Sequence, residues 1–308
     1  MRFWPFGRKR ESRADLVINR NLHLSVLAQR RSLPPLLSVV NPDGSNGAVQ
    51  GFGAPLFEGA TKDILNEPLR QGDYGIVTPR QDTVLQMTIV PLEEIPQFQK
   101  PSTETERRQS GVTEAMIPFL DAADVLLDTT IRGYKDALVS MRFFLDYVKR
   151  LGELAEGVVA DPLAETYRMP TDLYVKDRLH PHVDFREIGA TRVEALDDGL
   201  WVSSRGMAKF NLPELEMYGV ATEDFDAAVR MIIAACQQVI LGVPFRIGET
   251  AFLPSQPLQI VEGTRNRDIW GDRPTLEFRD PRGQGAAKGV AAWKAAHLSG
   301  QSDSTDLR

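Results

Sequence analysis

The sequence predicts an α+β protein, in which a mainly antiparallel sheet carries two long helices packed on one face. Three observations predict this class. Short stretches alternate apolar with polar residues, as strands do, and two longer stretches repeat apolar residues at helical spacing. The strand-like stretches come both before and after each helix-like stretch. A further hypothesis is that the chain contains two ferredoxin-like halves, although the sequence shows no internal similarity that would mark a repeat.

The first half of this pattern runs from residue 84 to residue 162. The stretch VLQMTIV at 84–90 alternates, and the mostly apolar stretch 122–131 predicts a buried strand. Apolar residues recur at helical spacing from Leu138 to Leu151, which predicts a long amphipathic helix. A short strand is expected within 155–162, where Pro162 ends it.

The second half follows the same logic. Alternation predicts a strand over 182–196, and the Asp-Asp-Gly run at 197–199 predicts a hairpin that returns as a strand over 200–207. Another strand is expected over 213–220. Thr222 is the expected N-cap of a second long helix, which ends near Gly242.

We divide the chain into four parts on these grounds. They are a basic and aromatic flexible leader (1–13), an N-terminal segment of irregular structure and short strands (14–82), an α+β core domain (83–280) and a disordered tail (281–308). Within the core, the polar stretch 101–111 is expected to be a long loop or linker. The tail is small and polar, which is typical of disorder.

The 308-residue chain has the composition of an ordinary soluble globular protein, with 42% apolar and 25% charged residues. Its formal net charge of −6 disfavours nucleic-acid binding, because that binding needs many cations to neutralise phosphates. The single cysteine, Cys236, excludes an intrachain disulfide and fits a cytoplasmic location. No stretch reaches the roughly 18 consecutive apolar residues that a membrane-spanning helix needs.

The first residues combine aromatic and basic side chains. Phe3, Trp4 and Phe6 precede an Arg-Lys-Arg run, without the apolar stretch of a secretory signal. We expect a flexible leader, because chain ends are poorly ordered unless they are tied down. The alternative is that the three aromatic side chains contact an anionic membrane surface or a protein partner.

The stretch LHPHVDF at 179–185 is the sharpest lead to a metal site. In a strand, His180, His182 and Asp184 would lie on one face, and imidazole and carboxylate groups are natural zinc or iron ligands. Metallohydrolase motifs of this kind commonly carry another histidine after the aspartate, where this chain has Phe185. A polar, solvated strand face therefore explains these residues better than a metal site.

Glu214 and Glu216 raise the question of acid–base chemistry. Side chains two residues apart on a strand share a face, and paired carboxylates about 5–10 Å apart catalyse glycoside hydrolysis. Any exposed strand face rich in glutamate meets that test, so we interpret the pair as a solvated face and predict no catalytic residue. The alternative is a polar site formed by Arg205, Glu214 and Glu216.

Other residues that could carry chemistry have plainer explanations. Cys236 lies on the apolar stripe of the second helix and is expected to be a buried, inert thiol. The glycine-rich stretch 51–59 lacks the third glycine and the following helix of a dinucleotide-binding loop, so we expect no cofactor. Four arginines near the C-terminal strands are expected to solvate a face rather than bind an anion: Arg265, Arg267, Arg273 and Arg279.

The segment Ser204–Glu216 reads S-R-G-M-A-K-F-N-L-P-E-L-E. It resembles a motif, T-x-G-M/L-x-x-F-G-x-P-E-L-E, found late in an uncharacterised bacterial family that is classed as a domain of unknown function. Ser204 stands here in place of threonine and Asn211 in place of glycine. The order of predicted elements across 83–280 is also similar. The resemblance implies a soluble bacterial α+β domain without an established activity.

These observations favour a cytoplasmic interaction or accessory protein without catalytic activity, and with a protein partner that the sequence does not identify. The alternative is an enzyme or small-ligand binder that uses one of the two polar strand faces described above, with or without a metal.

Overall fold

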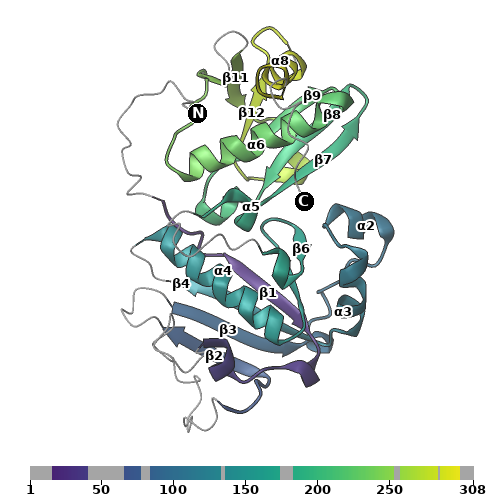
Figure 1. Ribbon diagram of the computed structural model, residues 1–308, viewed down its shortest axis with the longest axis vertical. Coiled ribbons are helices and arrows are strands. Elements are labelled where there is room, and N and C mark those ends of the chain that lie inside the picture. The colour runs from purple at the N-terminus through teal and green to yellow at the C-terminus, as the bar shows by residue number, and fades with distance from the viewer. Residues whose placement is uncertain are drawn as a thin grey trace. The chain divides into compact units, whose positions relative to one another are not determined.

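The computed structural model describes residues 16–40, 66–77, 84–132, 136–173, 183–252, 257–283 and 285–298. The chain forms two compact units (Figure 1). The N-terminal unit comprises Ile18–Ala190 and Arg205–Asn211. The C-terminal unit comprises the described residues up to Val17, Thr191–Ser204 and the described residues from Leu212 on. We expected one core domain over 83–280, whereas the structure divides the chain near residue 190.

The N-terminal unit contains a six-stranded sheet of order β2-β3-β4-β1-β5-β6, in which every pair of neighbours is antiparallel. Its strands are β1 (His23–Ala28), β2 (Gly72–Val77), β3 (Val84–Pro91), β4 (Val125–Arg132), β5 (Val158–Asp161) and β6 (Thr166–Arg168). β1 lies between β4 and β5, inside the sheet. The segment 14–82, which we placed outside the core, therefore supplies an internal strand.

The predicted patterns place the core of this unit correctly. Leu85, Met87 and Ile89 of β3 are buried, while Thr88 between them is exposed. The long helix α4 (Ala137–Leu154) buries its apolar stripe and packs against β1 and β5. The shorter helices of the unit are α1 (Leu36–Val40), α2 (Glu104–Gln109), α3 (Ile117–Ala122) and α5 (Phe185–Ile188).

The C-terminal unit contains a second six-stranded sheet, of order β10-β11-β12-β9-β8-β7. Its strands are β7 (Ala190–Leu196), β8 (Gly199–Arg205), β9 (Glu214–Val220), β10 (Thr250–Phe252), β11 (Pro257–Glu262) and β12 (Thr275–Arg279). β9 and β12 run parallel, with Glu216 in register with Glu277. β8 pairs antiparallel with β9, with Ser203 opposite Glu216.

Two helices pack against β9 of this sheet, namely α6 (Phe225–Ile240) and α8 (Ala287–Leu298). The apolar stripe of α6 is buried, as its spacing predicted. Gly242, with φ of 93°, follows the helix in the left-handed region that a C-terminal glycine favours. A short helix, α7 (Arg267–Trp270), lies between β11 and β12 in the chain.

Three stretches differ from the expectation, and capping boxes explain two of them. α2 lies inside the expected linker 101–111, because Thr103 and Glu106 form a capping box. α5 interrupts the strand expected over 182–196, because Asp184 and Glu187 form another. Thr222 begins a 3-10 turn (Thr222–Asp224) rather than capping α6 directly.

The tail differs as well. We expected disorder over 281–308, yet Ala287–Leu298 forms α8. Lys294 ties this helix down, since its Nζ donates to Asp224 Oδ1 at 2.8 Å and to the Glu223 carbonyl at 2.6 Å. The residues after Leu298 lie outside the described residues.

The predicted fold class is confirmed in its coarse form, because both helices and mainly antiparallel sheets are present. The two long helices belong to different units, so they do not share one sheet face as predicted. The ferredoxin-like halves stay a prediction. Among the described residues, no helix has both the length and the apolar character that crossing a membrane requires.

Candidate functional site

The three candidate metal ligands do not share a described strand face. His180 and His182 lie outside the described residues. Asp184 is the N-cap of α5, and its carboxylate accepts the backbone N–H of Arg186 at 2.9 Å and pairs with the Arg186 guanidinium at 2.7 Å. Within the described ranges, no three His, Cys, Asp or Glu side chains gather closely enough to hold a metal ion.

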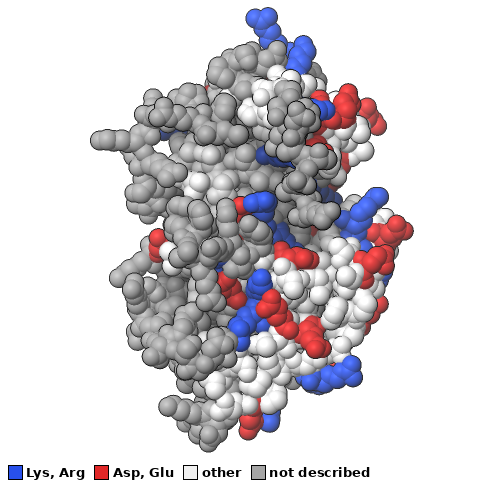
Figure 2. All heavy atoms as spheres, in the orientation of Figure 1, with Lys and Arg blue, Asp and Glu red and all other residues white. Residues whose placement is uncertain are grey.

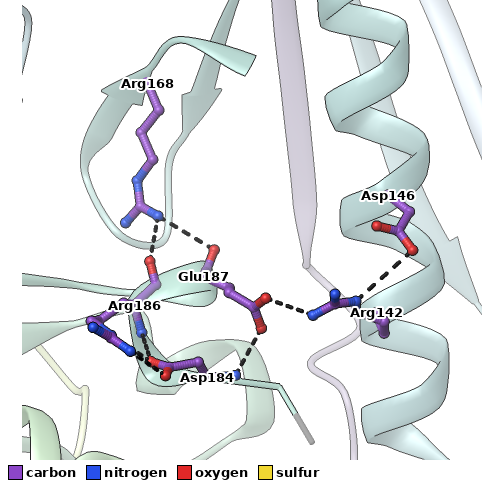
Figure 3. A network of polar contacts seen from close by, with 6 residues as sticks. All are labelled: Arg142, Asp146, Arg168, Asp184, Arg186 and Glu187. Carbon is purple, nitrogen blue, oxygen red and sulfur yellow. Dashed lines mark hydrogen bonds and ion pairs between the residues drawn. The ribbon is translucent and has the colours of Figure 1, made fainter. Parts of the chain in front are cut away.

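Asp184 belongs to a polar network in the N-terminal unit (Figure 3). Glu187 accepts from Arg142 of α4 at 2.6 Å and from the backbone N–H of Asp184 at 2.7 Å. Arg168 of β6 donates to the carbonyls of Arg186 and Glu187 at 2.8 and 3.3 Å. The network therefore joins α4, α5 and β6, which is a structural role.

Arg205 belongs to the N-terminal unit, together with the rest of the segment Arg205–Asn211. Its guanidinium is buried and lies 3.4 Å from Glu165 Oε2. Lys209 of the same segment is also buried, and its Nζ donates to Asp161 Oδ2 at 2.5 Å and to the Ile188 carbonyl. Gly206, with φ of 111°, permits the close approach, because a Cβ there would stand 2.6 Å from the Ile188 carbonyl oxygen.

Glu214 and Glu216 belong to the C-terminal unit, so Arg205 and the two glutamates are held by contacts in different units. The expectation of a solvated strand face is wrong for both glutamates, which are 1% and 0% exposed. Glu214 Oε2 accepts the hydroxyl of Ser204 at 2.6 Å, and that hydroxyl oxygen accepts the backbone N–H of Leu215 at 2.8 Å. Glu214 is therefore satisfied by its own sheet.

Three aromatic side chains converge on Glu216. Its Oε2 accepts from Trp201 Nε1 at 3.1 Å, from the Tyr218 hydroxyl at 2.9 Å and from Trp270 Nε1 at 3.0 Å. Trp201 stacks on Tyr218 at 5.7 Å between ring centres, and Trp270 meets Trp201 edge-on at 5.9 Å. β8, β9 and α7 each supply one of the rings.

A second carboxylate stands beside this cluster. Glu277 of β12 is in register with Glu216 on a neighbouring parallel strand, so the two side chains point to the same face of the sheet. Glu277 is buried, and its Oε1 lies 3.7 Å from a nitrogen of Arg265. We call the set Trp201, Glu216, Tyr218, Trp270 and Glu277 the acidic–aromatic site.

Each carboxylate of the site keeps one oxygen that accepts no hydrogen bond from the described residues, Oε1 in both cases. Glu216 Oε1 is packed tightly, since a Cβ added at Gly263 would stand 2.6 Å from it and 2.1 Å from Thr275 Oγ1. A buried acceptor without a donor is costly, so the two oxygens distinguish this site from Glu214.

The electrostatics follow from this burial. Burial raises the pKa of Glu216, the three aromatic donors lower it, and the charge of Glu277 raises it further. Burial also raises the pKa of Glu277, against the lowering effect of Arg265 and Arg279. Indole N–H groups can only donate, so a proton on Glu216 belongs on Oε1 rather than Oε2.

The arrangement is suited to holding positive charge. Two carboxylates concentrate negative charge on one sheet face, and the aromatic face of Tyr218 attracts cations. The Arg265 guanidinium already lies over that ring, 4.5 Å from its centre. The expectation that Arg265 solvates a face therefore misses its contact with the site, although its side chain is one-third exposed.

One of the five residues of the site was a candidate from the sequence alone. Glu216 was singled out because of its spacing from Glu214, and Glu277, Trp201, Tyr218 and Trp270 were missed. A buried strand that carries Glu-x-Tyr beside a second strand with Thr-x-Glu is a signal for a polar sheet face. Pairing those two strands needs the fold, because Glu216 and Glu277 are far apart in the chain.

One other expectation, that of an inert Cys236, can be compared with the structure. Cys236 is buried and free, and burial raises the pKa of its thiol, as an inert cysteine requires. Figure 2 shows Lys and Arg interspersed with Asp and Glu over the described residues of the face it displays.

No protein-family model, curated protein or solved structure matches this chain. The family resemblance of Ser204–Glu216 therefore stays a prediction.

Proposed function

We propose that the chain is a non-catalytic interaction or accessory protein, and that its acidic–aromatic site binds a positively charged group. One observation supports this most: Glu216 and Glu277 are buried side by side, and each keeps an oxygen that accepts no hydrogen bond from the described residues. A buried carboxylate oxygen that accepts no hydrogen bond is unfavourable, and a bound cation that donates to it relieves that cost. The Tyr218 ring adds a cation–π attraction.

The contacts favour recognition over turnover. Three aromatic donors already occupy Glu216 Oε2, which ties this oxygen to the protein. A guanidinium lies next to Glu277, so the site accommodates a cation beside a carboxylate. These are stacking and charge contacts, which give selectivity without moving a proton.

Titration of the full chain with small probes tests the proposal. Methylguanidinium, methylammonium, N-methylurea and acetate would be added while the indole N–H signals of Trp201 and Trp270 are followed by NMR. We expect the two cations to shift these signals and the neutral and anionic probes to leave them in place. The variant Glu277→Gln should lose the response. A response to N-methylurea equal to that of the cations contradicts charge recognition.

An interaction protein also needs a partner, and the proposal places it in the bacterial cytoplasm. Contact of Phe3, Trp4 and Phe6 with a partner or an anionic membrane belongs to the same proposal, although these residues lie outside the described ranges. Pull-downs from native cells with the full chain and with residues 1–13 deleted test it. Recovery of no specific protein by either form contradicts the interaction role.

A further inference from the structure

The acidic–aromatic site already contains a cation of the chain's own. The guanidinium carbon of Arg265 lies 4.5 Å from the centre of the Tyr218 ring, and one of its nitrogens lies 3.7 Å from Glu277 Oε1. The next residue, Asn266, donates its side-chain amide to the Tyr218 hydroxyl at 3.3 Å. The connection between β11 and α7 thus places Arg265 over the site.

Arg265 satisfies the site incompletely. A separation of 3.7 Å gives Coulomb attraction but is too long for a hydrogen bond, so Glu277 Oε1 stays without a donor among the described residues. Glu216 Oε1 also lacks a hydrogen-bond donor among the described residues. A guanidinium carries five N–H donors in a planar fork. A fork that sits closer to the sheet can give Glu277 Oε1 the hydrogen bond that it lacks, whereas Glu216 Oε1 is packed against Gly263 and Thr275.

Arg265 is also placed to move. Its side chain is 33% exposed, whereas that of Glu277 is 3% exposed, so the arginine lies at the outer side of the site. It follows the last residue of β11 by three positions, and rotating its side chain moves no strand. Its nitrogen lies 3.7 Å from Glu277 Oε1, so a cation that makes a hydrogen bond to this oxygen can displace it.

We infer that Arg265 is a displaceable stand-in for the ligand of this site, and that the ligand is a guanidinium group. This inference rests on the proposed function of the site. Guanidinium fits better than ammonium because it is planar, stacks on aromatic faces, is weakly hydrated and donates to two oxygens at once. Glu277 offers such an oxygen beside the Tyr218 ring, and Glu216 adds negative charge on the neighbouring strand, about 4.8 Å away. The group is carried by a small molecule or by an arginine of a partner chain.

Calorimetric titration with methylguanidinium tests the displacement. We expect Arg265→Ala to bind methylguanidinium about tenfold more tightly than the wild-type chain, because the competing cation is gone. Arg267→Ala is the matched control. Its guanidinium is 44% exposed and pairs with Glu262 at 3.6 Å, so the substitution removes the same charge from the same region without touching the site. This control should bind as the wild type does.

Two further titrations define the ligand. The variant Arg265→Ala should bind methylammonium more weakly than it binds methylguanidinium. Stronger binding of methylammonium overturns the guanidinium assignment. Agmatine and a short capped peptide with one arginine distinguish the two sources. Tighter binding of agmatine indicates a small molecule, and tighter binding of the peptide indicates a partner's arginine.

The outcomes separate this inference from the proposed function. If the wild-type chain and Arg265→Ala bind methylguanidinium with equal affinity, the role of Arg265 is overturned but the proposed binding site is not. If neither protein binds methylguanidinium, the proposed function itself is overturned. If Arg265→Ala does not fold, Arg265→Gln replaces it, because glutamine keeps a long side chain without the charge. Its affinity for methylguanidinium is then compared with that of the wild-type chain in the same way.

Discussion

The carboxylate of Glu216 is completely buried, and hydrogen bonds reach only one of its two oxygens among the described residues. Three donors converge on Oε2, while Oε1 faces Gly263 and Thr275. Burial disfavours the charged form and the aromatic donors favour it, with the first effect the larger. The residue therefore links the stability of the C-terminal unit to pH.

The variant Glu216→Gln tests this link. A raised pKa means that the folded chain binds the proton more tightly than the unfolded chain. The contribution of Glu216 to the free energy of unfolding is then largest below about pH 4, the ordinary range of a glutamate, and falls as the pH rises through the raised pKa. Urea unfolding between pH 4 and pH 8 should show a smaller fall for the neutral glutamine. Parallel curves for variant and wild type contradict the account.

Gly263 offers a second test at the scale of the residue. An alanine Cβ would stand 2.1 Å from Thr275 Oγ1 and 2.6 Å from Glu216 Oε1, so neighbouring groups must move. We expect Gly263→Ala to lower the free energy of unfolding by about 1–3 kcal/mol, as overpacking does. Gly283→Ala, in an exposed turn, serves as the control and should cost under about 0.5 kcal/mol by the same denaturation measurement.

The periodicity of apolar residues predicts the strands and long helices of this protein. The short helices α2 and α5 are marked instead by their N-terminal capping residues. The alternation of β3 and the apolar stripes of α4 and α6 were enough to predict those elements. α2 and α5 were missed because a helix of one or two turns has too few residues to show a period. Their capping boxes, Thr103 with Glu106 and Asp184 with Glu187, were the available signal.

The cap of α2 makes a prediction for this element alone. Thr103→Ala removes the side-chain acceptor for the backbone N–H of Glu106, 3.2 Å away, at a cost of about 1 kcal/mol. Because α2 buries no residue, the loss should appear as faster amide hydrogen exchange within Glu104–Gln109, with little change in global unfolding. Unchanged exchange in this helix contradicts the assignment of the cap.

A second consequence concerns pH. Backbone N–H groups of Thr103 and Ser102 lower the pKa of Glu106 to about 2. A lowered carboxyl pKa stabilises the folded form above the ordinary value and loses that effect as the pH falls. The exchange protection of α2 should therefore persist at neutral pH and decline between about pH 4 and pH 2.

At the scale of the whole molecule, the chain does not complete one unit before it begins the next. β7 and most of β8 belong to the C-terminal unit, and the chain then supplies Arg205–Asn211 to the N-terminal unit before β9. The sequence predicted two successive strands here, over 200–207 and 213–220, because local patterns show the strands. They do not show which unit the intervening residues contact. The same limit hid the pairing of Glu216 with Glu277.

Lys209 makes this arrangement testable. It is fully buried in the supplied segment and its Nζ contacts Asp161 of β5 at 2.5 Å. Lys209→Met leaves the Asp161 carboxylate buried without its cation, which should cost about 3–5 kcal/mol of unfolding free energy. The double variant with Asp161→Asn should recover part of that loss.

The matched control is Lys149→Met on α4. Lys149 pairs with Glu153 at 3.9 Å with both side chains partly exposed, so its loss should cost under about 1 kcal/mol. Similar losses for the two lysine variants in chemical denaturation contradict a supporting role for the segment Arg205–Asn211.

The central claim is that the face of the C-terminal sheet with Glu216 and Glu277 binds a guanidinium group. A crystal structure of Arg265→Ala grown with methylguanidinium tests it most directly. We expect the cation to stack over Tyr218, with N–H groups within hydrogen-bond distance of Glu277 Oε1. A cation bound only elsewhere, or a site that stays without one at concentrations that saturate binding in solution, contradicts the account.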